Sequence, residues 1–410
     1  MDRDKILRAK ASLVESTERN SLLDVIESDV EAFKGSRVIY STDNAGAPVN
    51  NFQNEELFAD VFSKSKLLVY SEDIMVQMKS GQADLAFKQR ALFDTNLVSD
   101  LPRYFRGEVL TTRERVEKIL DIVITQLGGG HDFGFPMLEN LRFFVSDNCQ
   151  WPIYKVAAAH YLDEKIFNTS TGQKEFSFET TPEMFRKAQE TWEMYRSNRF
   201  VWKQLDRRDL VYLLMLRTMN ICWETPNLVL ENALQELVEF CLRELNVLPL
   251  KELYFAWKVL IGFIYQDFTP VFDEPELKSP KEKSLERIRA LSWDLFLFRY
   301  TETLLSEEKG NIVSLPCVTT LDKDLVKTMK LCKVKAVLMY EQIGFVETIF
   351  EDEGEFQVCL DASMNQHQKF VLHEQNRQIN DRYVSRYTLQ KEIAKQERMI
   401  NKKIQSAKTG

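Results

Sequence analysis

The chain has 410 residues, of which 44% are hydrophobic and 28% charged, which is typical of a globular protein with a large core. At roughly 150 residues per domain, this length suggests two or three units. No apolar run approaches the roughly 18 residues that cross a bilayer, and the N-terminus Met1-Asp2-Arg3-Asp4-Lys5 lacks the apolar core of a signal peptide, so we expect a cytoplasmic protein without a membrane span.

Soft metal ligands are sparse. Six cysteines are scattered without a Cys-x-x-Cys pair, and the chain has only four histidines. This pattern argues against a disulfide framework and against a zinc site. A metal ion would therefore be held by oxygen atoms, which favours Mg²⁺ or Mn²⁺. The net charge of -8 does not indicate nucleic-acid binding by the whole chain, although residues 361–410 are richer in basic than in acidic side chains.

Taken in chain order, residues 1–35 place leucine, valine and isoleucine at helical spacing, which predicts one or two amphipathic helices. Residues 36–51 are loop-like, with a turn signal in Asn44-Ala45-Gly46-Ala47-Pro48. Lys66-Leu67-Leu68-Val69-Tyr70 predicts a short strand. A second apolar run, Ala91-Leu92-Phe93, predicts a buried strand that ends directly at Asp94. We expect these two strands to begin one sheet.

The next segment predicts two helices separated by glycines. Residues 114–127 have helical periodicity and stop at Gly128-Gly129-Gly130. The triple glycine lacks the Lys-Ser/Thr pair and the flanking strand of a phosphate-binding loop, so we interpret it as a helix stop followed by a loop. Residues 135–141 then open a helix-like stretch that carries Glu139 on an otherwise apolar surface.

Residues 181–267 look almost wholly helical, which predicts a helical insertion. Within them, Asp206-Arg207-Arg208-Asp209 is interpreted as an exposed turn with mixed salt bridges. A long amphipathic helix follows at 285–305 and carries Asp294.

The last third of the chain predicts a further piece of the sheet and then a tail. Residues 313–320 predict a strand that runs into Asp322, 325–331 a short helix and 336–339 another strand, which is the βαβ pattern of a parallel sheet. The last 45 residues repeat apolar side chains at multiples of seven, which predicts a helical tail with weak coiled-coil character. The repeat consists of Leu372, Ile379, Ile393 and Ile400.

Three acids, Asp94, Asp294 and Asp322, suggest one metal site. Asp94 and Asp322 each follow a strand, and a parallel α/β sheet presents such carboxylates at its carboxyl edge, where ligands bind. Two Mg²⁺ ions roughly 4 Å apart can hydrolyse a phosphodiester, and they need three or four carboxylates to hold them. Carboxylates packed this closely raise one another's pKa unless a cation is present.

The order of these acids resembles the pattern of PIN-like metal-dependent nucleases. The matching segments are Phe93-Asp94-Thr95-Asn96, Glu139, Trp293-Asp294 and Thr320-Leu321-Asp322-Lys323-Asp324-Leu325. The resemblance implies a small parallel α/β sheet flanked by helices. It also implies that Asp94, Glu139, Asp294 and Asp322 are the metal ligands and catalytic residues, with Asn96 supporting the first and Asp324 near the last.

The pattern departs from the family in its spacing, because some 140 residues separate the second acid from the third and the first Asp lies well inside the chain. The expected fold class is therefore a PIN-like α/β core interrupted by a large helical insertion and followed by a helical C-terminal tail. The units we expect are an N-terminal helical region with the first strands (1–90), the core in two parts (91–150 and 285–360), the insertion (151–284) and the basic tail (361–410).

Each of these residues also has a structural interpretation. An Asp after a strand is often only a helix N-cap or turn former, which applies to both Asp94 and Asp322. Glu139 could pair with Arg142 on the surface. Four arginines shortly after Asp94 could meet a phosphate backbone, with Tyr104 and Phe105 available for stacking, or they could line a solvated face. These arginines are Arg103, Arg106, Arg113 and Arg115.

The resulting hypothesis is a metal-dependent endonuclease that acts on single-stranded RNA more readily than on DNA, with a regulatory partner or a second copy bound through the insertion or the tail. Such an architecture suggests a toxin or an antiviral, phage-defence effector. One alternative is a phosphoryl-transfer or topoisomerase-primase-like metal enzyme, to which Asp322-x-Asp324 fits. Asn96 argues against a haloacid-dehalogenase phosphatase, because asparagine cannot donate the proton required there. The other alternative is a helical interaction protein without enzymatic activity.

Overall fold

The computed structural model describes most of the chain, and all structural statements below concern those residues. They are 3–17, 21–44, 46–49, 52, 56–79, 86–141, 150–169, 181–225, 227–265, 275–306, 312–377 and 384–409. Within these ranges, no helix combines the length and the apolar character that a membrane crossing requires. Arg142, Cys149 and Ile379, which the sequence analysis used, lie outside the described residues.

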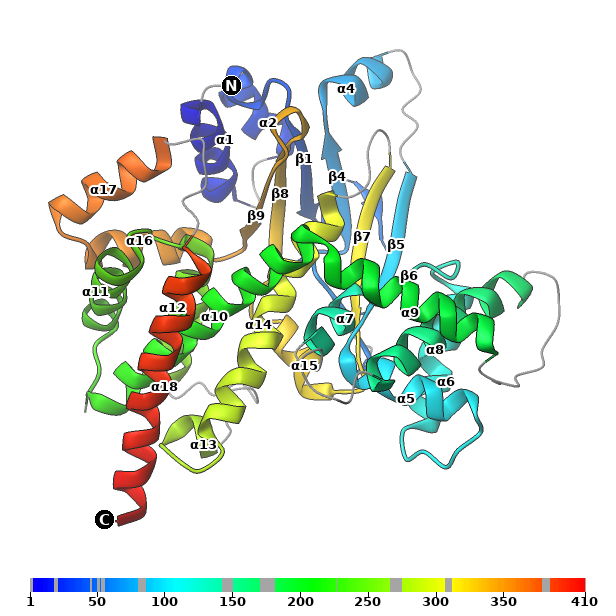
Figure 1. Cartoon of the computed structure of the whole chain (residues 1–410). Helices are drawn as coiled ribbons and strands as arrows, with labels where there is room; N and C mark the ends of the chain where they lie inside the picture. Colours follow the sequence, from blue (N-terminus) through cyan, green and yellow to red (C-terminus); the bar gives the residue numbers. More distant parts are fainter. Residues whose placement is uncertain are drawn as a thin grey trace.

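The described residues form a mixed α/β protein in which helices predominate (Figure 1). The helices in the first half are α1 (Arg3–Glu15), α2 (Leu22–Ser28), α3 (Val30–Phe33), α4 (Glu72–Lys79), α5 (Thr95–Phe105), α6 (Arg113–Thr125), α7 (Gly134–Asn140), α8 (Gln150–Thr169) and α9 (Pro182–Ser197). Those in the second half are α10 (Arg199–Glu224), α11 (Leu230–Phe240), the π-helical turn η2 (Cys241–Leu245), α12 (Leu250–Tyr265), α13 (Pro275–Lys278), α14 (Ser284–Ser306), α15 (Lys323–Met329), the 3₁₀ turn η3 (Glu341–Ile343), α16 (Glu353–Ser363), α17 (Gln366–Arg377) and α18 (Arg386–Thr409).

The strands fall into two sheets. The antiparallel sheet has the order β2-β4-β1-β8-β9, and the mixed sheet has the order β3-β7-β5-β6. Their bounds are β1 (Arg37–Thr42), β2 (Ala47–Pro48), β3 (Phe58–Asp60), β4 (Lys66–Tyr70), β5 (Ala86–Phe93), β6 (His131–Asp132), β7 (Ile312–Thr319), β8 (Val334–Tyr340) and β9 (Phe345–Phe350). In the mixed sheet, β5 is parallel to both β6 and β7, while β3 pairs antiparallel with β7. The two sheets meet where Phe62, just after β3, bridges to Val334 at the start of β8.

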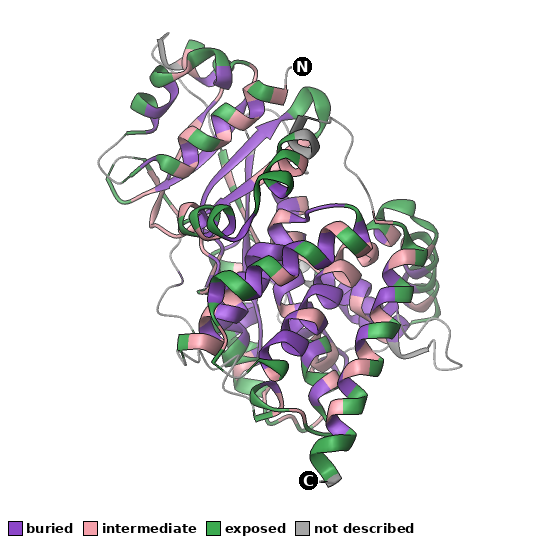
Figure 2. Ribbon diagram, turned by 90° about the vertical axis from the view of Figure 1, so that its left-hand side faces the viewer, coloured by how far each residue is buried: buried purple, intermediate pink, exposed green. Residues whose placement is uncertain are grey.

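Helices cover both faces of the mixed sheet, because side chains alternate along its central strand. Ala91 and Phe93 of β5 face one apolar cluster, which also contains buried residues of α5, α6 and α8. Leu92 between them belongs to a larger cluster built mainly on α10, α12 and α14. Figure 2 shows that many strand residues are buried, while exposed residues lie mainly on the outer faces of the surrounding helices and in the connecting segments. The first part of β5 is an exception, because Ala86 and Lys88 are exposed. The last three residues of β5, Ala91 to Phe93, are thus buried, as the apolar run before Asp94 predicts.

Several predicted elements are confirmed. The helices at the N-terminus, at 114–127, in 181–267 and at 285–305 are present, as are the strands that end at Asp94 and Thr320. Three predictions are wrong. The strand at 66–70 and the strand that ends at Asp94, expected to begin one sheet, belong to different sheets, β4 to the antiparallel sheet and β5 to the mixed sheet. Residues 37–42, expected as loop, form β1. The strand after α15 does not extend a parallel sheet: β8 belongs to the antiparallel sheet, between β1 and β9.

The error in β8 has an identifiable cause. Gly344 adopts a left-handed φ of 63°, which closes the short turn η3 and returns the chain as β9. The resulting hairpin sets β8 antiparallel to β9, and β1 then covers its other edge. The prediction considered the helix before β8 and overlooked this turn after it.

The basic tail does not project as a separate coiled coil. Helix α18 packs along α10, with Leu389 and Ile400 buried. Asn220 Nδ2 of α10 donates to Gln396 Oε1 at 2.9 Å, and Lys403 Nζ lies 2.9 Å from Glu224 Oε1. Of the apolar repeat, Ile393 and Ile400 lie on α18 and pack into the core within the chain, beside a helix that the sequence could not specify.

The three consecutive glycines, Gly128 to Gly130, have a structural role: they end helix α6 and allow close packing in the mixed sheet. Gly128 and Gly129 have φ of 59° and 80°, which end α6 in the left-handed region. A Cβ on Gly130 would lie 2.6 Å from the backbone oxygen of Gln89 in β5. Close approach of two backbones therefore accounts for the third glycine, without a phosphate ligand.

We expect Gly130→Ala to lower the free energy of unfolding by about 1–3 kcal/mol, because β6 must move away from β5 to relieve the clash. Urea denaturation measures the change. Gly354→Ala is the matched control, since its Cβ would meet only Val14 Cγ1 at an ordinary 3.6 Å within helix α16. A control variant as destabilised as Gly130→Ala would show that the clash is not the cause.

Candidate active site

The candidate site lies at the carboxyl edge of the mixed sheet, where β5 and β7 end side by side. Phe93 pairs with Thr319 in register, and the Asp94 amide donates to the Thr319 carbonyl oxygen at 3.0 Å. The chain leaves β5 toward β6 on one side and returns as β7 on the other. Asp94 therefore stands at a topological switch point, the position at which open α/β sheets bind their ligands.

Asp94 is buried, with 3% of its surface exposed, and both of its carboxylate oxygens accept hydrogen bonds. Oδ1 accepts from the Leu97 amide at 2.8 Å, which caps helix α5. Oδ2 accepts from the Thr320 hydroxyl, which follows β7. The N-cap interpretation of Asp94 is thus confirmed, and the carboxylate also joins the ends of two parallel strands.

The pKa of Asp94 is raised to about 7. Burial is the main cause, because it removes water from the charged form; the hydrogen bonds from Leu97 and Thr320 only partly offset it. The nearby carboxylates of Asp322 and Glu139 raise the pKa further by like-charge repulsion. The ionised form of Asp94, buried beside two other carboxylates, is therefore electrostatically unfavourable. A cation at this edge would relieve the repulsion.

Glu139 reaches this cluster from helix α7, which follows β6. The Thr95 hydroxyl, one residue after Asp94, donates to Glu139 Oε2. Asp132 at the end of β6 fixes the start of α7, since its Oδ1 accepts from the Gly134 amide at 2.9 Å and from the Tyr300 hydroxyl at 3.3 Å. The third strand thereby delivers a carboxylate to the same edge.

Asp322 lies just past β7 and is exposed. Its Oδ1 caps helix α15 by accepting from the amides of Asp324 at 2.8 Å and Leu325 at 3.4 Å. Its own amide donates to Thr320 Oγ1 at 2.8 Å, so the same hydroxyl contacts both Asp94 and the Asp322 backbone. The N-cap interpretation holds for Asp322 as well.

The other predicted site residues lie less centrally. Asp294 is in the middle of α14, a helix that packs against both α7 and α15. Asn96 is exposed on the first turn of α5. Asp324 is exposed and its Oδ1 lies 3.0 Å from Lys327 Nζ. The structure therefore brings Asp94, Glu139 and Asp322 together, while Asn96 and Asp324 face solvent.

The fit of a metal ion to these residues is partial. Among the described residues, no group of three or more His, Cys, Asp or Glu side chains is arranged as a metal site. The three carboxylates bind hydroxyl and amide donors instead, as given above. Coordination of one cation by all three requires side chains to leave these partners.

Of the four arginines, one contacts this edge. Arg115 Nη1 donates to the Leu321 carbonyl oxygen at 2.8 Å, which holds the turn before Asp322. Arg103 and Arg106 lie at 3.1 and 2.7 Å from the two carboxylate oxygens of Glu108, away from the acids. Arg113 lies over Tyr104 at 5.3 Å and pairs with Glu117.

The proposed stacking role of Phe105 is wrong, since its side chain is buried against Tyr161. Its place in helix α5 puts it on the face that packs onto the sheet.

The sequence analysis missed the side chains that orient the acids, namely Thr95 and Thr320, and the buried residues on β6. His131 stacks on Phe93 at 5.2 Å, and its Nε2 lies 3.2 Å from Asp163 Oδ1 on α8. Burial alone would lower the pKa of His131, but Asp163 outweighs it and the pKa is raised. A two-residue strand gives no periodicity, so β6 had no detectable signal, whereas Thr320 was visible as the residue between the strand and the acid.

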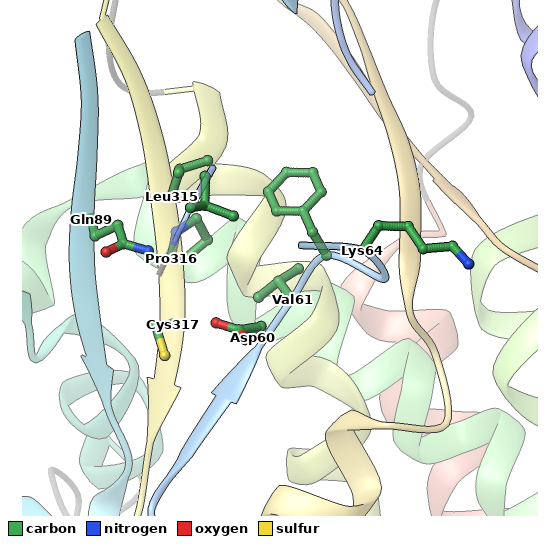
Figure 3. Close-up of a pocket in the computed structure, with 9 residues that line it drawn as sticks. Asp60, Val61, Lys64, Gln89, Leu315, Pro316 and Cys317 are labelled. Atoms are coloured by element: carbon green, nitrogen blue, oxygen red, sulfur yellow. The ribbon is translucent and has the colours of Figure 1, made fainter. Parts of the chain in front are cut away.

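A separate small pocket lies where the two sheets meet (Figure 3). Figure 3 shows Gln89 of β5 and Cys317 of β7 on one side, with Asp60 and Val61 opposite. Burial raises the pKa of Asp60, whose Oδ2 accepts from the Phe52 amide at 2.7 Å. The pocket shares no lining residue with the acidic cluster.

The chain matches no known family model, no curated protein and no solved structure. A proposal of function therefore depends on the geometry of the carboxyl edge.

Proposed function

We propose that the chain is a metal-dependent nuclease of the PIN-like class that hydrolyses phosphodiester bonds, in RNA rather than DNA. The observation that carries the proposal is Asp94, a buried carboxyl at the switch point of the mixed sheet, whose pKa is raised mainly by burial and further by Asp322 and Glu139. Such a cluster of carboxylates lowers the stability of the fold, which favours a functional role for these residues. Oxygen ligands at this edge suit Mg²⁺ or Mn²⁺ best.

In this proposal Asp94, Glu139 and Asp322 hold the cation, and Asp294 is the fourth ligand by resemblance. When bound, the cation supplies an activated water and stabilises the leaving oxygen. Thr95 and Thr320 hold the carboxylates through their hydroxyls. Arg115 fixes the turn before Asp322. A single strand fits an edge of this kind, because its phosphate can reach the acids without a duplex in the way.

A non-enzymatic interaction protein is the second candidate. It is favoured by one observation: Asp94 and Asp322 both serve as helix N-caps, which accounts for their positions without chemistry. Asparagine is also a good N-cap, so substitution to asparagine separates the two candidates. It preserves the cap and removes the charge.

We expect purified protein to cleave labelled single-stranded RNA in Mn²⁺, and Asp94→Asn and Asp322→Asn each to lower the rate at least about 10²-fold. Loss of a charged ligand in a buried site is worth about 3–5 kcal/mol, and each 1.4 kcal/mol is a factor of ten. Asp324→Asn is the matched control, because Asp324 is exposed and paired with Lys327. Labelled single-stranded DNA in the same assay tests the preference for RNA.

Cleavage that survives in both asparagine variants, or that persists in chelator, would contradict the proposal. The absence of any cleavage by the unaltered chain would move the assignment to the interaction protein.

A further inference from the structure

Arg208, in the segment 206–209, lies in surroundings that differ from the exposed turn predicted for this segment. The segment is not an exposed turn but lies inside helix α10, and the Arg208 side chain is only 15% exposed. Its guanidinium lies on the Trp293 ring of α14, 4.5 Å from the ring centre. Burying an arginine in this way costs free energy, which the contacts of its guanidinium must offset.

The contacts of Trp293 place Arg208 next to the acidic cluster. The Trp293 ring packs edge-on against Phe135 of α7, with centroids 5.8 Å apart. Phe135 precedes Glu139 by one helical turn, so the two share a face of α7. Trp293 is also the residue before Asp294 in the chain. Arg208 thus approaches Glu139 and the proposed fourth ligand from the α10 side, and Glu139 is among the charges that act on it.

Two buried hydrogen-bond donors, on Arg208 and Trp293, have no acceptor among the described residues. Arg208 Nη1 lies 3.2 Å from Asp209 Oδ1, whereas the buried Arg208 Nε has no hydrogen-bond partner among the described residues. The indole Nε1 of Trp293, a side chain that is 5% exposed, also has none. Two buried N–H donors without acceptors, on side chains in contact, are an arrangement that an anion with several oxygens would satisfy.

Groups of both charge signs surround Arg208. The neighbouring groups are Asp209, Glu139, Tyr212 and a second arginine, Arg289 of α14. Arg289 pairs with Glu397 at 3.0 Å. The surroundings of Arg208 therefore contain a second guanidinium beside the carboxylates.

We propose that Arg208, with the Trp293 indole N–H, forms the phosphate-binding part of the acidic site, and that the ligand is a phosphodiester whose non-bridging oxygens accept from these two donors. The inference rests on the proposed function. In that function Arg208 supplies a positive charge, besides that of the cation, to a nucleic-acid phosphate at the acidic site. Arg208 would then bind and orient the scissile phosphate while the carboxylates hold the cation.

The test uses inorganic phosphate on the full chain without metal. We expect phosphate to raise the melting temperature of the unaltered chain beyond the rise from sodium chloride at equal ionic strength. Arg208→Gln should abolish that excess. Arg217→Gln is the matched control: Arg217 is on the same helix, 14% exposed, over the Phe240 ring and with an unpartnered Nε, but it pairs with Glu236.

Trp293→Phe provides a second variant, because it keeps the stacked ring and removes only the N–H donor. We expect it to reduce the excess shift, while Trp257→Phe, at another buried tryptophan with an unpartnered Nε1, leaves it unchanged. An excess shift that is absent in the unaltered chain, or equal in Arg208→Gln and Arg217→Gln, would overturn the proposal.

Cleavage of single-stranded RNA in Mn²⁺ separates this inference from the proposed function. We expect Arg208→Gln to lower kcat/KM at least about tenfold relative to Arg217→Gln, as loss of a charged hydrogen bond does, while the Mn²⁺-dependent thermal shift remains. Equal cleavage by the two variants would overturn the role of Arg208 even if the nuclease is real. A phosphate shift that depends on Arg208 in a chain that cleaves nothing would keep the anion site and reject the nuclease.

Discussion

Replacing Glu353 by alanine is expected to lower the free energy of unfolding by about 3–5 kcal/mol, because it breaks a buried ion network and leaves the two cations Lys10 and Lys251 to share the single carboxylate of Glu347. Glu353 Oε1 lies 2.8 Å from Lys10 Nζ, and Oε2 lies 3.2 Å from Lys251 Nζ. Glu347 of β9 lies 2.7 Å from the same Lys10 nitrogen. The network ties α1, α12, β9 and α16 together, so the loss should affect the whole fold. Urea denaturation at pH 7 measures it.

The same network predicts the behaviour in acid. Burial alone would raise the pKa of Glu347, but Lys10 and Lys251 outweigh it and lower the pKa to about 2. A lowered pKa contributes stability that is complete above the usual 4.5 and is lost as the pH falls toward 2. We therefore expect the melting temperature to fall steeply over this interval, and less steeply in Glu353→Ala. Glu355→Ala, at an exposed position of the same helix, is the control. A Glu353→Ala variant as stable as this control would contradict the account of the network.

Asp94→Asn is expected to stabilise the metal-free protein at pH 8 by up to about 4 kcal/mol, which is the free energy equivalent to a rise in pKa from 3.8 to about 7. The sign follows from the direction of the shift. A raised pKa gives stability that is complete below 3.8 and is lost as the pH rises through 7, so the ionised carboxylate disfavours the fold at pH 8. Asparagine keeps the cap to Leu97 and carries no charge.

The measurement is the melting temperature of both proteins in chelator at pH 5 and pH 8. We expect a higher value for Asp94→Asn at pH 8 and a smaller difference between the two proteins at pH 5, where only part of the stability has been lost. Asp324→Asn, at an exposed acid, should change neither. A destabilised Asp94→Asn at pH 8 would mean that the ionised carboxylate is satisfied by the fold as it stands, and would remove the electrostatic reason for a cation.

The sequence predicts the local parts of this architecture well and its long-range pairing less well. Asp94 and Thr320 were assigned to strand ends because each follows an apolar run, and the pairing of Phe93 with Thr319 confirms that these ends lie at one edge. The sheet to which a strand belongs depends on partners far along the chain. For β8 these are β1 and β9, and the short turn at Gly344 decides the outcome.

The candidate site, too, could be predicted from the sequence only in part. The acids could be named because carboxylates after strands are visible in sequence, but the hydroxyls that orient them could not be ranked without their geometry. Arg208 was misinterpreted for a related reason: four charged residues in a row indicate exposure, while the helical face of α10 turns Arg208 onto Trp293. Helical phase within a long apolar bundle is set by packing, which a charge pattern does not reveal.

The central claim is that the acids at the carboxyl edge bind a divalent cation, and the most direct test is the Mn²⁺-induced change in melting temperature at pH 8. We expect Mn²⁺ to raise the melting temperature of the unaltered chain, since a ligand that binds only the folded state stabilises it. Asp94→Asn should lose this rise, and Asp324→Asn should keep it. A rise of equal size in Asp94→Asn, or none in the unaltered chain, would contradict the claim.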